Sequence, residues 1–378
     1  MLSRFWVMSV NWLKIGPYIE QSTVRNTDCQ YGEFDAIGVN IGKEILPMRG
    51  NISEKDFSNF FLVPPRHFAY NPRGSRKLGL GYNATPNTYI ITFNDVVFRV
   101  KPEAESVILP EFLFLYLSRK EWDRKAEYLS WGSSTEVFSW ETLCDVEIPA
   151  PSIKKQRELV ATWKGLRDMK EQNEAMAAPL MQLCQSRLQE LKHTYPLTEI
   201  GPYIELCDET NAESIQYKML GINKDKVFMP TAANVSTVDI KKYKVVKSGR
   251  FVFSGMQTGR DVCIRISLYD DEEPCLVSPA YTTFTIKEGM NLLPEYFFLY
   301  FKRTEMDRLG WFVSDSSVRS NLDWNRFLEI QIPIPSKDEQ QAIVNIYKCA
   351  AECKRIADEA DRLSREICPA LMQKAIRG

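Results

Sequence analysis

The chain has 378 residues, of which 44% are hydrophobic, and its formal net charge at pH 7 is −1. This length and composition exclude an intrinsically disordered chain and are sufficient for two domains of ordinary size. The near-zero net charge excludes binding of nucleic acid through overall basic charge, so any such binding must come from local basic patches or from partner subunits.

Cysteine and histidine usage predicts a cytoplasmic protein with reduced thiols. The nine cysteines include no Cys-x-x-Cys pair, and only His67 and His193 supply imidazoles, which argues against a disulfide framework or a zinc site. Cys349 and Cys353 lie one helical turn apart without a further ligand nearby, so we interpret them as packing residues. The most apolar run, residues 112–117, is far shorter than the roughly 20 residues that span a bilayer, and we expect no membrane anchor.

The first 150 residues predict a domain of mixed α and β structure. Residues 89–100 are rich in β-branched and aromatic side chains between turn residues, and residues 250–254 repeat this composition, which favours strands in both regions. Residues 109–127 carry apolar side chains at helical spacing and then charges, which predicts one amphipathic helix.

A block of this chain occurs twice. Residues 109–160 align without a gap on residues 293–344, an offset of 184, and 19 of the 52 aligned positions are identical. Upstream, the string Ile-Gly-Pro-Tyr-Ile-Glu at 15–20 recurs at 200–205. A period of this length indicates domain duplication and not a solenoid, because solenoid repeats are much shorter. Each half therefore has the same order, which is strands, the block and a long charged helix.

Each half ends in a predicted long helix. In the second half, Ser336 followed by Glu339 matches a capping box, in which the two residues satisfy free amides at the helix start. The first copy keeps Ser152 but has Lys155 in place of the glutamate, which predicts a weaker cap. Pro179 and Pro369 lie inside the two helices and predict a kink or a loosened turn in each.

The apolar residues of both helices are spaced alternately three and four apart, which is typical of a coiled coil. In the second helix they are Ile343, Ile346, Ala350, Cys353, Ala357, Ala360, Ser364, Ile367 and Leu371. In the first helix they are Leu159, Trp163, Leu166, Ala177, Leu180, Cys184 and Leu191, interrupted by Lys170 and Asn173. The larger residues of one helix are expected to fill space left by the smaller residues of the other.

The sequence gives no support for catalysis in this chain. It lacks a glycine-rich dinucleotide loop, a Walker loop, His-Glu-x-x-His and Gly-x-Ser-x-Gly, and the string Val-Pro-Pro-Arg at 63–66 is not the catalytic loop of an amino-methyltransferase. The acidic run at 270–273 is more typical of a solvated loop than of a metal site.

This arrangement resembles the DNA-specificity (S) subunits of type I restriction-modification systems. The resemblance is carried by Ile-Pro-Ala-Pro-Ser at 148–152 with Gln156, and by Ile-Pro-Ile-Pro-Ser at 332–336 with Gln340, each opening a long helix. Leu-Pro-Glu at 109–111 and 293–295 also fits the family pattern. The resemblance covers essentially the whole chain. The order of variable domain, Ile-Pro-x-Pro-Ser motif and long helix, repeated twice, is more specific than any single motif.

The resemblance implies an α+β fold with two target recognition domains, at 1–150 and 194–335, separated by antiparallel coiled-coil helices at 151–193 and 336–378 in a pseudo-twofold frame. It also implies that each domain reads one half of a split, asymmetric target in double-stranded DNA, while helix length sets the unread spacer. No cofactor is expected in this chain. S-adenosylmethionine and ATP are expected on the partners, which are two modification subunits and the restriction subunits.

Basic and amide side chains in the variable loops are the candidates for DNA contact, because arginine favours guanine edges and asparagine or glutamine favours adenine edges. Taken alone, such charge runs are typical of a solvated surface. Tyr70 and Phe253, at matching positions, are interpreted as core residues and not as base-stacking residues. The candidates of the first half are Arg66, Asn71, Arg73, Arg76, Lys77, Ser133 and Ser134, and those of the second half are Lys247, Arg250, Gln257, Arg260, Ser317 and Arg319.

Two other readings stay open at this point. The first is a duplicated coiled-coil scaffold that organises protein partners without binding DNA, and the second is a stand-alone DNA methyltransferase or nuclease. The arginine and lysine clusters in both variable halves favour DNA recognition over the scaffold. The missing cofactor and catalytic loops disfavour the enzyme.

Overall fold

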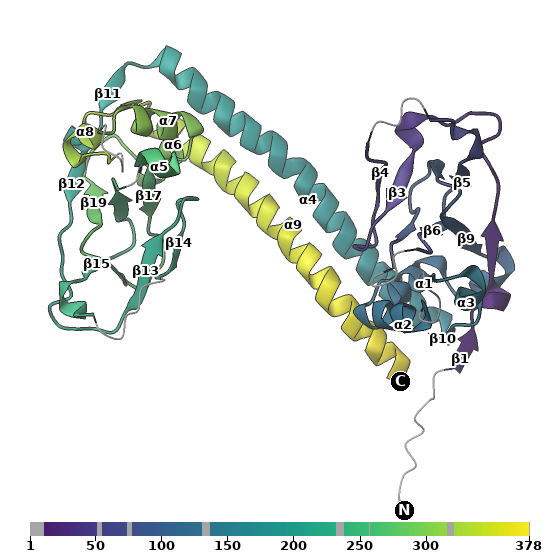
Figure 1. Cartoon of the computed structure of the whole chain (residues 1–378). Coiled ribbons are helices and arrows are strands. Elements are labelled where there is room, and N and C mark those ends of the chain that lie inside the picture. The colour runs from purple at the N-terminus through teal and green to yellow at the C-terminus, as the bar shows by residue number, and fades with distance from the viewer. Residues whose placement is uncertain are drawn as a thin grey trace, which may run out of the picture. The chain divides into compact units, whose positions relative to one another are not determined.

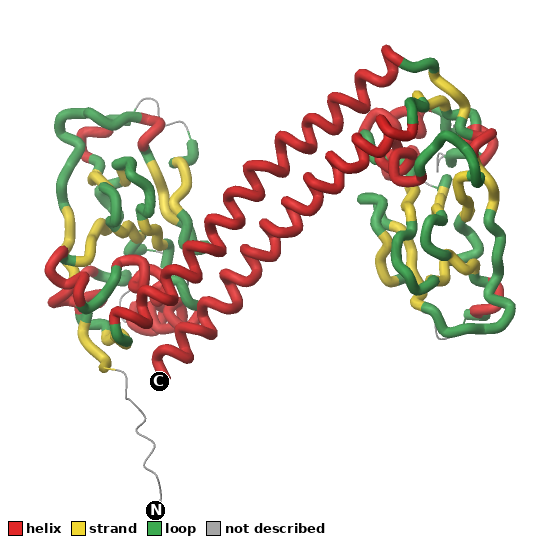
Figure 2. Tube along the Cα trace, turned by 180° about the vertical axis from the view of Figure 1, so that it is seen from behind, coloured by secondary structure: helices red, strands yellow, loops and turns green. Residues whose placement is uncertain are grey.

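The computed structural model describes residues 11–50, 55–73, 78–130, 137–231, 238–256, 258–315 and 321–377, and the chain divides into two compact units (Figure 1). Unit 1 comprises Met1–Gln172 with Ile356–Gly378, and unit 2 comprises Asn173–Arg355. Each unit combines strands with helices, shown in yellow and red in Figure 2, so the predicted α+β class is confirmed.

Unit 1 is built on a four-stranded antiparallel sheet in the order β2-β9-β6-β7. Its strands are β2 (Ile19–Ser22), β9 (Val96–Val100), β6 (Phe68–Tyr70) and β7 (Leu80–Tyr82). Three two-stranded ribbons complete the described strands of the unit: β1 (Asn11–Lys14) with β10 (Glu147–Ala150), β3 (Ile37–Val39) with β4 (Ile45–Pro47), and β5 (Phe61–Val63) with β8 (Tyr89–Ile91). The strands predicted within 89–100 are therefore confirmed as β8 and β9.

Unit 2 repeats this plan with one larger sheet. The equivalent antiparallel sheet has the order β12-β19-β16-β17, and a second, mixed sheet has the order β14-β13-β18-β15. The first sheet contains β12 (Ile204–Leu206), β19 (Thr282–Ile286), β16 (Phe251–Ser254) and β17 (Arg265–Leu268). The second contains β14 (Phe228–Pro230), β13 (Lys218–Ile222), β18 (Cys275–Val277) and β15 (Lys244–Val246), and β11 (Leu197–Glu199) pairs with β20 (Gln331–Pro333).

The prediction of one helix over 109–127 is wrong, because the segment forms α1 (Pro110–Leu117) and α2 (Lys120–Ser130). The Ser118 hydroxyl and the Arg119 guanidinium donate to the carbonyl groups of Phe114 and Tyr116, which ends α1 by satisfying its last acceptors. Unit 2 has the same break. There the corresponding helices are α6 (Pro294–Phe301) and α7 (Thr304–Phe312), and the shorter helices of the two units are α3 (Trp140–Cys144), α5 (Thr258–Asp261) and α8 (Trp324–Leu328).

The core of each unit is aromatic and lies between the central sheet and these helices. Phe68 stacks on Phe98 with ring centroids 4.6 Å apart, and Phe251 stacks on Phe284 at 4.9 Å. Stacked aromatic pairs add to the free energy gained from burial of their area. Tyr70 and Phe253 are buried within these clusters, which confirms their interpretation as core residues.

A buried glutamine joins each domain to its long helix. The side-chain oxygen of Gln340 accepts from the Leu293 amide at 2.8 Å, and its nitrogen donates to the carbonyl groups of Asn291 and Pro335 at 3.1 and 2.9 Å. Gln156 makes the same bonds in unit 1, to Leu109 at 2.9 Å and to Val107 and Pro151 at 2.8 Å each. Both glutamines are fully buried. Gln156 therefore fixes the start of its long helix to the start of α1, and Gln340 fixes the start of the other long helix to the start of α6.

The long helices are α4 (Ile153–Thr194) and α9 (Lys337–Arg377), and within each unit a segment of α4 packs antiparallel on a segment of α9 (Figures 1 and 2). In unit 1, Leu159 shares a cluster with Met372 while Lys170 pairs with Asp361. In unit 2, the Cys184 thiol contacts the Ile343 carbonyl, and Arg187 pairs with Glu339.

The predicted coiled-coil seam is confirmed by its burial. The buried seam residues are Leu159, Trp163, Cys184 and Leu191 of α4 and Ile343, Ala350, Cys353, Ala357 and Ala360 of α9. Both helices continue through Pro179 and Pro369.

The two helix starts are capped alike. Ser336 and Ser152 accept from the amides of Glu339 and Lys155 at 3.3 and 3.4 Å. The Glu339 carboxylate accepts from Arg187 and from the Tyr195 hydroxyl, so it ties the start of α9 to the end of α4 and does not complete the predicted capping box among the described residues.

Replacing Gln340 by alanine should lower the free energy of unfolding by about 1–3 kcal/mol, because it leaves the Leu293 amide and the Asn291 and Pro335 carbonyls without their buried partner. Urea unfolding monitored by circular dichroism measures the change. Gln341→Ala, at the exposed neighbouring position, is the matched control and should change stability little. Equal losses in the two variants would contradict a role for the buried bonds.

Candidate nucleic-acid interface

Two loops that carry the candidate residues of the first half lie side by side in unit 1. The first joins β6 to β7 and contains Asn71 and Arg73, and the second leads into α3 and is described from Val137 onward. Arg73 and Val137 form an antiparallel bridge, and the Phe138 amide donates to the Pro72 carbonyl at 2.8 Å. The Asn71 side chain accepts from the Arg73 amide at 2.8 Å, which fixes the turn where both exposed side chains begin.

Unit 2 presents the same pair of loops. The Leu322 amide donates to the Gly255 carbonyl at 2.8 Å, which joins the β16–β17 loop to the loop after α7. A β-carbon at Gly255 would overlap the Leu322 carbonyl oxygen, so this close approach requires glycine. Helix α7 also packs on the loop, because Gly310 leaves room for Ile264 and Thr258.

A buried lysine supports the hairpin loop in each unit. In unit 1, Lys43 donates to the Leu78 carbonyl at 2.6 Å and to Asp123 of α2 at 2.5 Å. Leu78 lies at the end of the β6–β7 loop, so the lysine connects this loop to α2. Its ammonium group is nearly fully buried, and the charge is compensated by the aspartate.

The equivalent link in unit 2 uses Lys226 and Asp307. The Lys226 ammonium lies 2.7 Å from the Asp307 carboxylate and also donates to the Phe301 carbonyl. The same Asp307 oxygen accepts from the Ile264 amide at 2.9 Å, at the end of the β16–β17 loop. Lys43 and Lys226 have backbone φ angles of 64° and 62°, so both units share the same tight turn at the lysine.

Three candidates lie away from the paired loops. Arg66 precedes β6, and Lys247 and Arg250 precede β16, whereas the paired loops follow these two strands. In each unit the strand therefore has these basic residues at one end and the loops at the other. DNA contact by Arg66, Lys247 and Arg250 stays a prediction, and it would have to be made at the other end of the strand from the paired loops.

All three basic side chains are also paired with carboxylates. Arg66 lies 2.7 Å from Glu105, and Lys247 and Arg250 lie 2.8 and 2.7 Å from Glu209. Hydrogen bonds from Lys247 and Arg250 hold the pKa of Glu209 below its usual value, so the carboxylate stays ionised and neutralises part of their charge.

The remaining candidates lie outside the described residues. They are Arg76, Lys77, Ser133, Ser134, Gln257, Ser317 and Arg319. Arg260 has a described backbone in α5, while its side chain lies outside the description.

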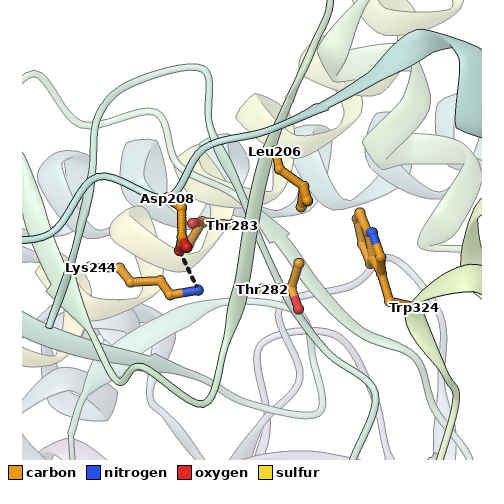
Figure 3. Close-up of a pocket in the computed structure, with 6 residues that line it drawn as sticks. All are labelled: Leu206, Asp208, Lys244, Thr282, Thr283 and Trp324. Carbon is orange, nitrogen blue, oxygen red and sulfur yellow. Dashed lines mark ion pairs between the residues drawn. The ribbon is translucent and has the colours of Figure 1, made fainter. Parts of the chain in front are cut away.

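A cavity that the sequence did not predict lies at the edge of the unit 2 sheet, beside the loop after α7 (Figure 3). Its volume is about 270 Å³, and half-buried Trp324 faces Leu206 and Thr282 across it. Asp208 and Lys244 form an ion pair of 2.8 Å at the other side, so these two charges compensate each other.

The described chain carries no group of three or more metal-ligating side chains, and none of its described helices is long and apolar enough to cross a membrane. The chain thus contains two α+β units, each with a pair of adjoining loops, and two long helices. Residues 199–351 match the family model described as the type I restriction modification DNA specificity domain. This match confirms the resemblance seen in the sequence.

A solved structure shares the fold. The chain is similar to the crystal structure of a type I restriction-modification system S subunit from M. genitalium, with a TM-score of 0.61 and 12% identity over 99% of this chain and 97% of that chain. The HsdS subunit from Thermoanaerobacter tengcongensis has a TM-score of 0.40 and 16% identity, over 98% and 97% of the two chains. A comparison with curated proteins finds no match.

The buried Lys226–Asp307 pair should be necessary for the unit 2 loop. Asp307→Asn leaves the Lys226 ammonium buried without an anion, which should lower the free energy of unfolding by about 3 kcal/mol. Denaturant unfolding of this variant against Asp338→Asn, in the first turn of α9, measures the effect. Wild-type stability in Asp307→Asn would contradict the assigned role.

Proposed function

We propose that the chain is the DNA-specificity subunit of a type I restriction-modification complex, in which each unit reads one half of a split, asymmetric sequence in double-stranded DNA. The observation that carries this proposal is the duplicated loop pair, which has one scaffold and two different sets of side chains. The hydrogen bonds at Pro72 and Gly255 are equivalent, while Asn71 and Arg73 differ from Gln257 and Arg260. Two units with the same loop scaffold but different loop side chains suit an asymmetric target.

In this proposal the chain is a non-catalytic subunit in the cytoplasm, and the chemistry resides on its partners. Two modification subunits would bring S-adenosylmethionine and methylate the target, and restriction subunits would bring ATP-driven cleavage. The near-zero net charge supports this division, because a chain with a charge of −1 needs partners to complete a DNA clamp. Phosphate contacts would position each unit, and base-edge contacts would specify the sequence.

The helices are proposed to dock these partners and to set the unread spacer. Met169, Met176 and Leu183 are exposed on α4 at seven-residue spacing, so they follow one stripe of the helix. This apolar stripe supports protein docking, and it also supports the alternative of a scaffold that never binds DNA.

A gel-shift series separates the proposal from the scaffold. The full chain, alone and co-expressed with the modification subunit encoded beside it, is titrated against random duplex and against a duplex pool enriched by selection. The proposal expects a split sequence to be bound at least about a thousandfold more tightly than random duplex. Equal affinity for all duplexes, with an intact protein complex, would favour the scaffold.

Arg73→Ala should cost about 1–3 kcal/mol of binding to the selected target and relax the requirement at one base position. Arg66→Ala is the matched control, since Arg66 is exposed at the other end of β6 and paired with Glu105. Its effect should be small. Equal losses for the two variants, or a loss of the same size on random duplex, would contradict base reading by Arg73.

One heptad inserted into each of α4 and α9 should lengthen the unread spacer and leave both half-sites unchanged, because seven residues add about 10 Å while preserving the seam. Methylome sequencing of cells that carry the variant complex reads the new target. Changed half-sites with the original spacer would contradict the assigned role of the helices.

A further inference from the structure

The last turns of α2 and α7 present the same two kinds of exposed side chain. Arg124 and Tyr128 lie four residues apart on α2, and Arg308 and Phe312 occupy the matching positions on α7. Residues at this spacing lie on one face of a helix. Tyr128 is 72% exposed and Phe312 is 85% exposed, so both units leave a large aromatic ring in solvent next to an exposed arginine.

Neither arginine has a charge partner in the described parts of the chain. The preceding residues, Asp123 and Asp307, point inward to the buried lysines and are unavailable to the guanidinium groups. Glu305, one turn before Arg308, pairs with Arg303. This contrasts with Arg66, Lys247 and Arg250, whose charges are compensated, and it leaves Arg124 and Arg308 open to an external anion.

These pairs adjoin the candidate interface. Helix α2 ends at Ser130, whose hydroxyl donates to the Ala126 carbonyl, and Lys43 ties Asp123 of α2 to Leu78 at the end of the β6–β7 loop. In unit 2, α7 packs on the β16–β17 loop through Gly310. The helices that carry the arginine and the aromatic ring thus adjoin the hairpin loop of each unit.

The residues of this face differ from the loop residues in one important respect. Arginine stands at both 124 and 308, and the matching positions 128 and 312 both hold an aromatic residue, whereas the loop side chains diverge between the halves. Groups that read bases must differ between two unlike half-sites, but the sugar-phosphate backbone is the same at both. A repeated guanidinium and ring therefore match the part of DNA that does not vary.

We propose that Arg124–Tyr128 and Arg308–Phe312 form one sequence-independent DNA-backbone contact in each unit. Each guanidinium binds a phosphate, and each ring packs against the adjoining sugar. Trp311, which is 55% exposed, enlarges the apolar contact in unit 2. Glu127 stands in its place in unit 1, so the unit 2 contact is the stronger one. This inference rests on the proposed function, because it assumes that the adjacent loops face DNA.

The test uses the full chain with its modification subunit and a labelled random duplex, together with the selected target. Arg124→Ala/Arg308→Ala should weaken binding to both duplexes by the same factor, roughly tenfold. The slope of log affinity against log salt concentration should fall by about 2, since two phosphate contacts are lost. Arg157→Ala, at an exposed position of α4, is the control and should change neither value.

A second variant keeps the arginines and removes the rings. Tyr128→Ala/Phe312→Ala should weaken binding to both duplexes several-fold with an unchanged salt slope, because rings contribute no charge. A loss confined to the selected target would overturn the inference and assign these residues to base reading. Unchanged DNA binding with loss of the modification subunit on size-exclusion chromatography would also overturn it, and would make this face a protein-docking surface.

The two proposals fail separately. If the wild-type complex prefers no sequence, the proposed function fails, while the salt slope on random duplex still reports whether the two arginines contact phosphate. If sequence preference is present and the arginine variant binds as the wild type does, the backbone contact alone is wrong.

Discussion

The buried lysine–aspartate link is the interaction on which the paired loops of each unit depend. Lys43 connects the β6–β7 loop to α2 through Asp123. In unit 2, Asp307 of α7 accepts both from Lys226 and from the Ile264 amide at the end of the β16–β17 loop. An ion pair of this kind compensates the cost of burying charge only when its geometry is fixed, so it constrains a loop more strictly than apolar packing does. The exposed loop side chains can then differ between the units while the support stays the same.

A buried glutamine in each unit joins the domain to its long helix. Gln156 and Gln340 satisfy the backbone where α1 or α6 begins and where the long helix leaves the domain. Each domain is thereby joined to its helix by directional hydrogen bonds and not by a free hinge. The strongest sequence identity between the halves falls on these supports and on the α1 and α6 segments. This distribution is expected when the supporting scaffold is shared and the exposed loop side chains vary.

The sequence predicted the duplication, the long helices with their seam, the strands within 89–100 and the burial of Tyr70 and Phe253, because each has a periodic or repeated signal. It did not predict the break at Ser118 and Arg119, which depends on side chains capping the end of α1. It grouped Arg66 with Arg73 in one basic patch, because a charge cluster in sequence does not reveal which end of a strand each residue occupies. The pairing of the two loops through Pro72 and Gly255 is a tertiary contact between segments more than 60 residues apart, and no local pattern encodes it.

The central claim is that the two units, which share a scaffold but differ in their loop side chains, recognise the two halves of a split DNA sequence. Methylome sequencing of cells that express the unaltered chain with its neighbouring modification subunit tests this claim most directly. The account predicts one methylated motif made of two different short segments, separated by a fixed number of unspecified bases. A continuous motif, a palindrome with two identical halves, or no sequence-specific methylation would contradict it.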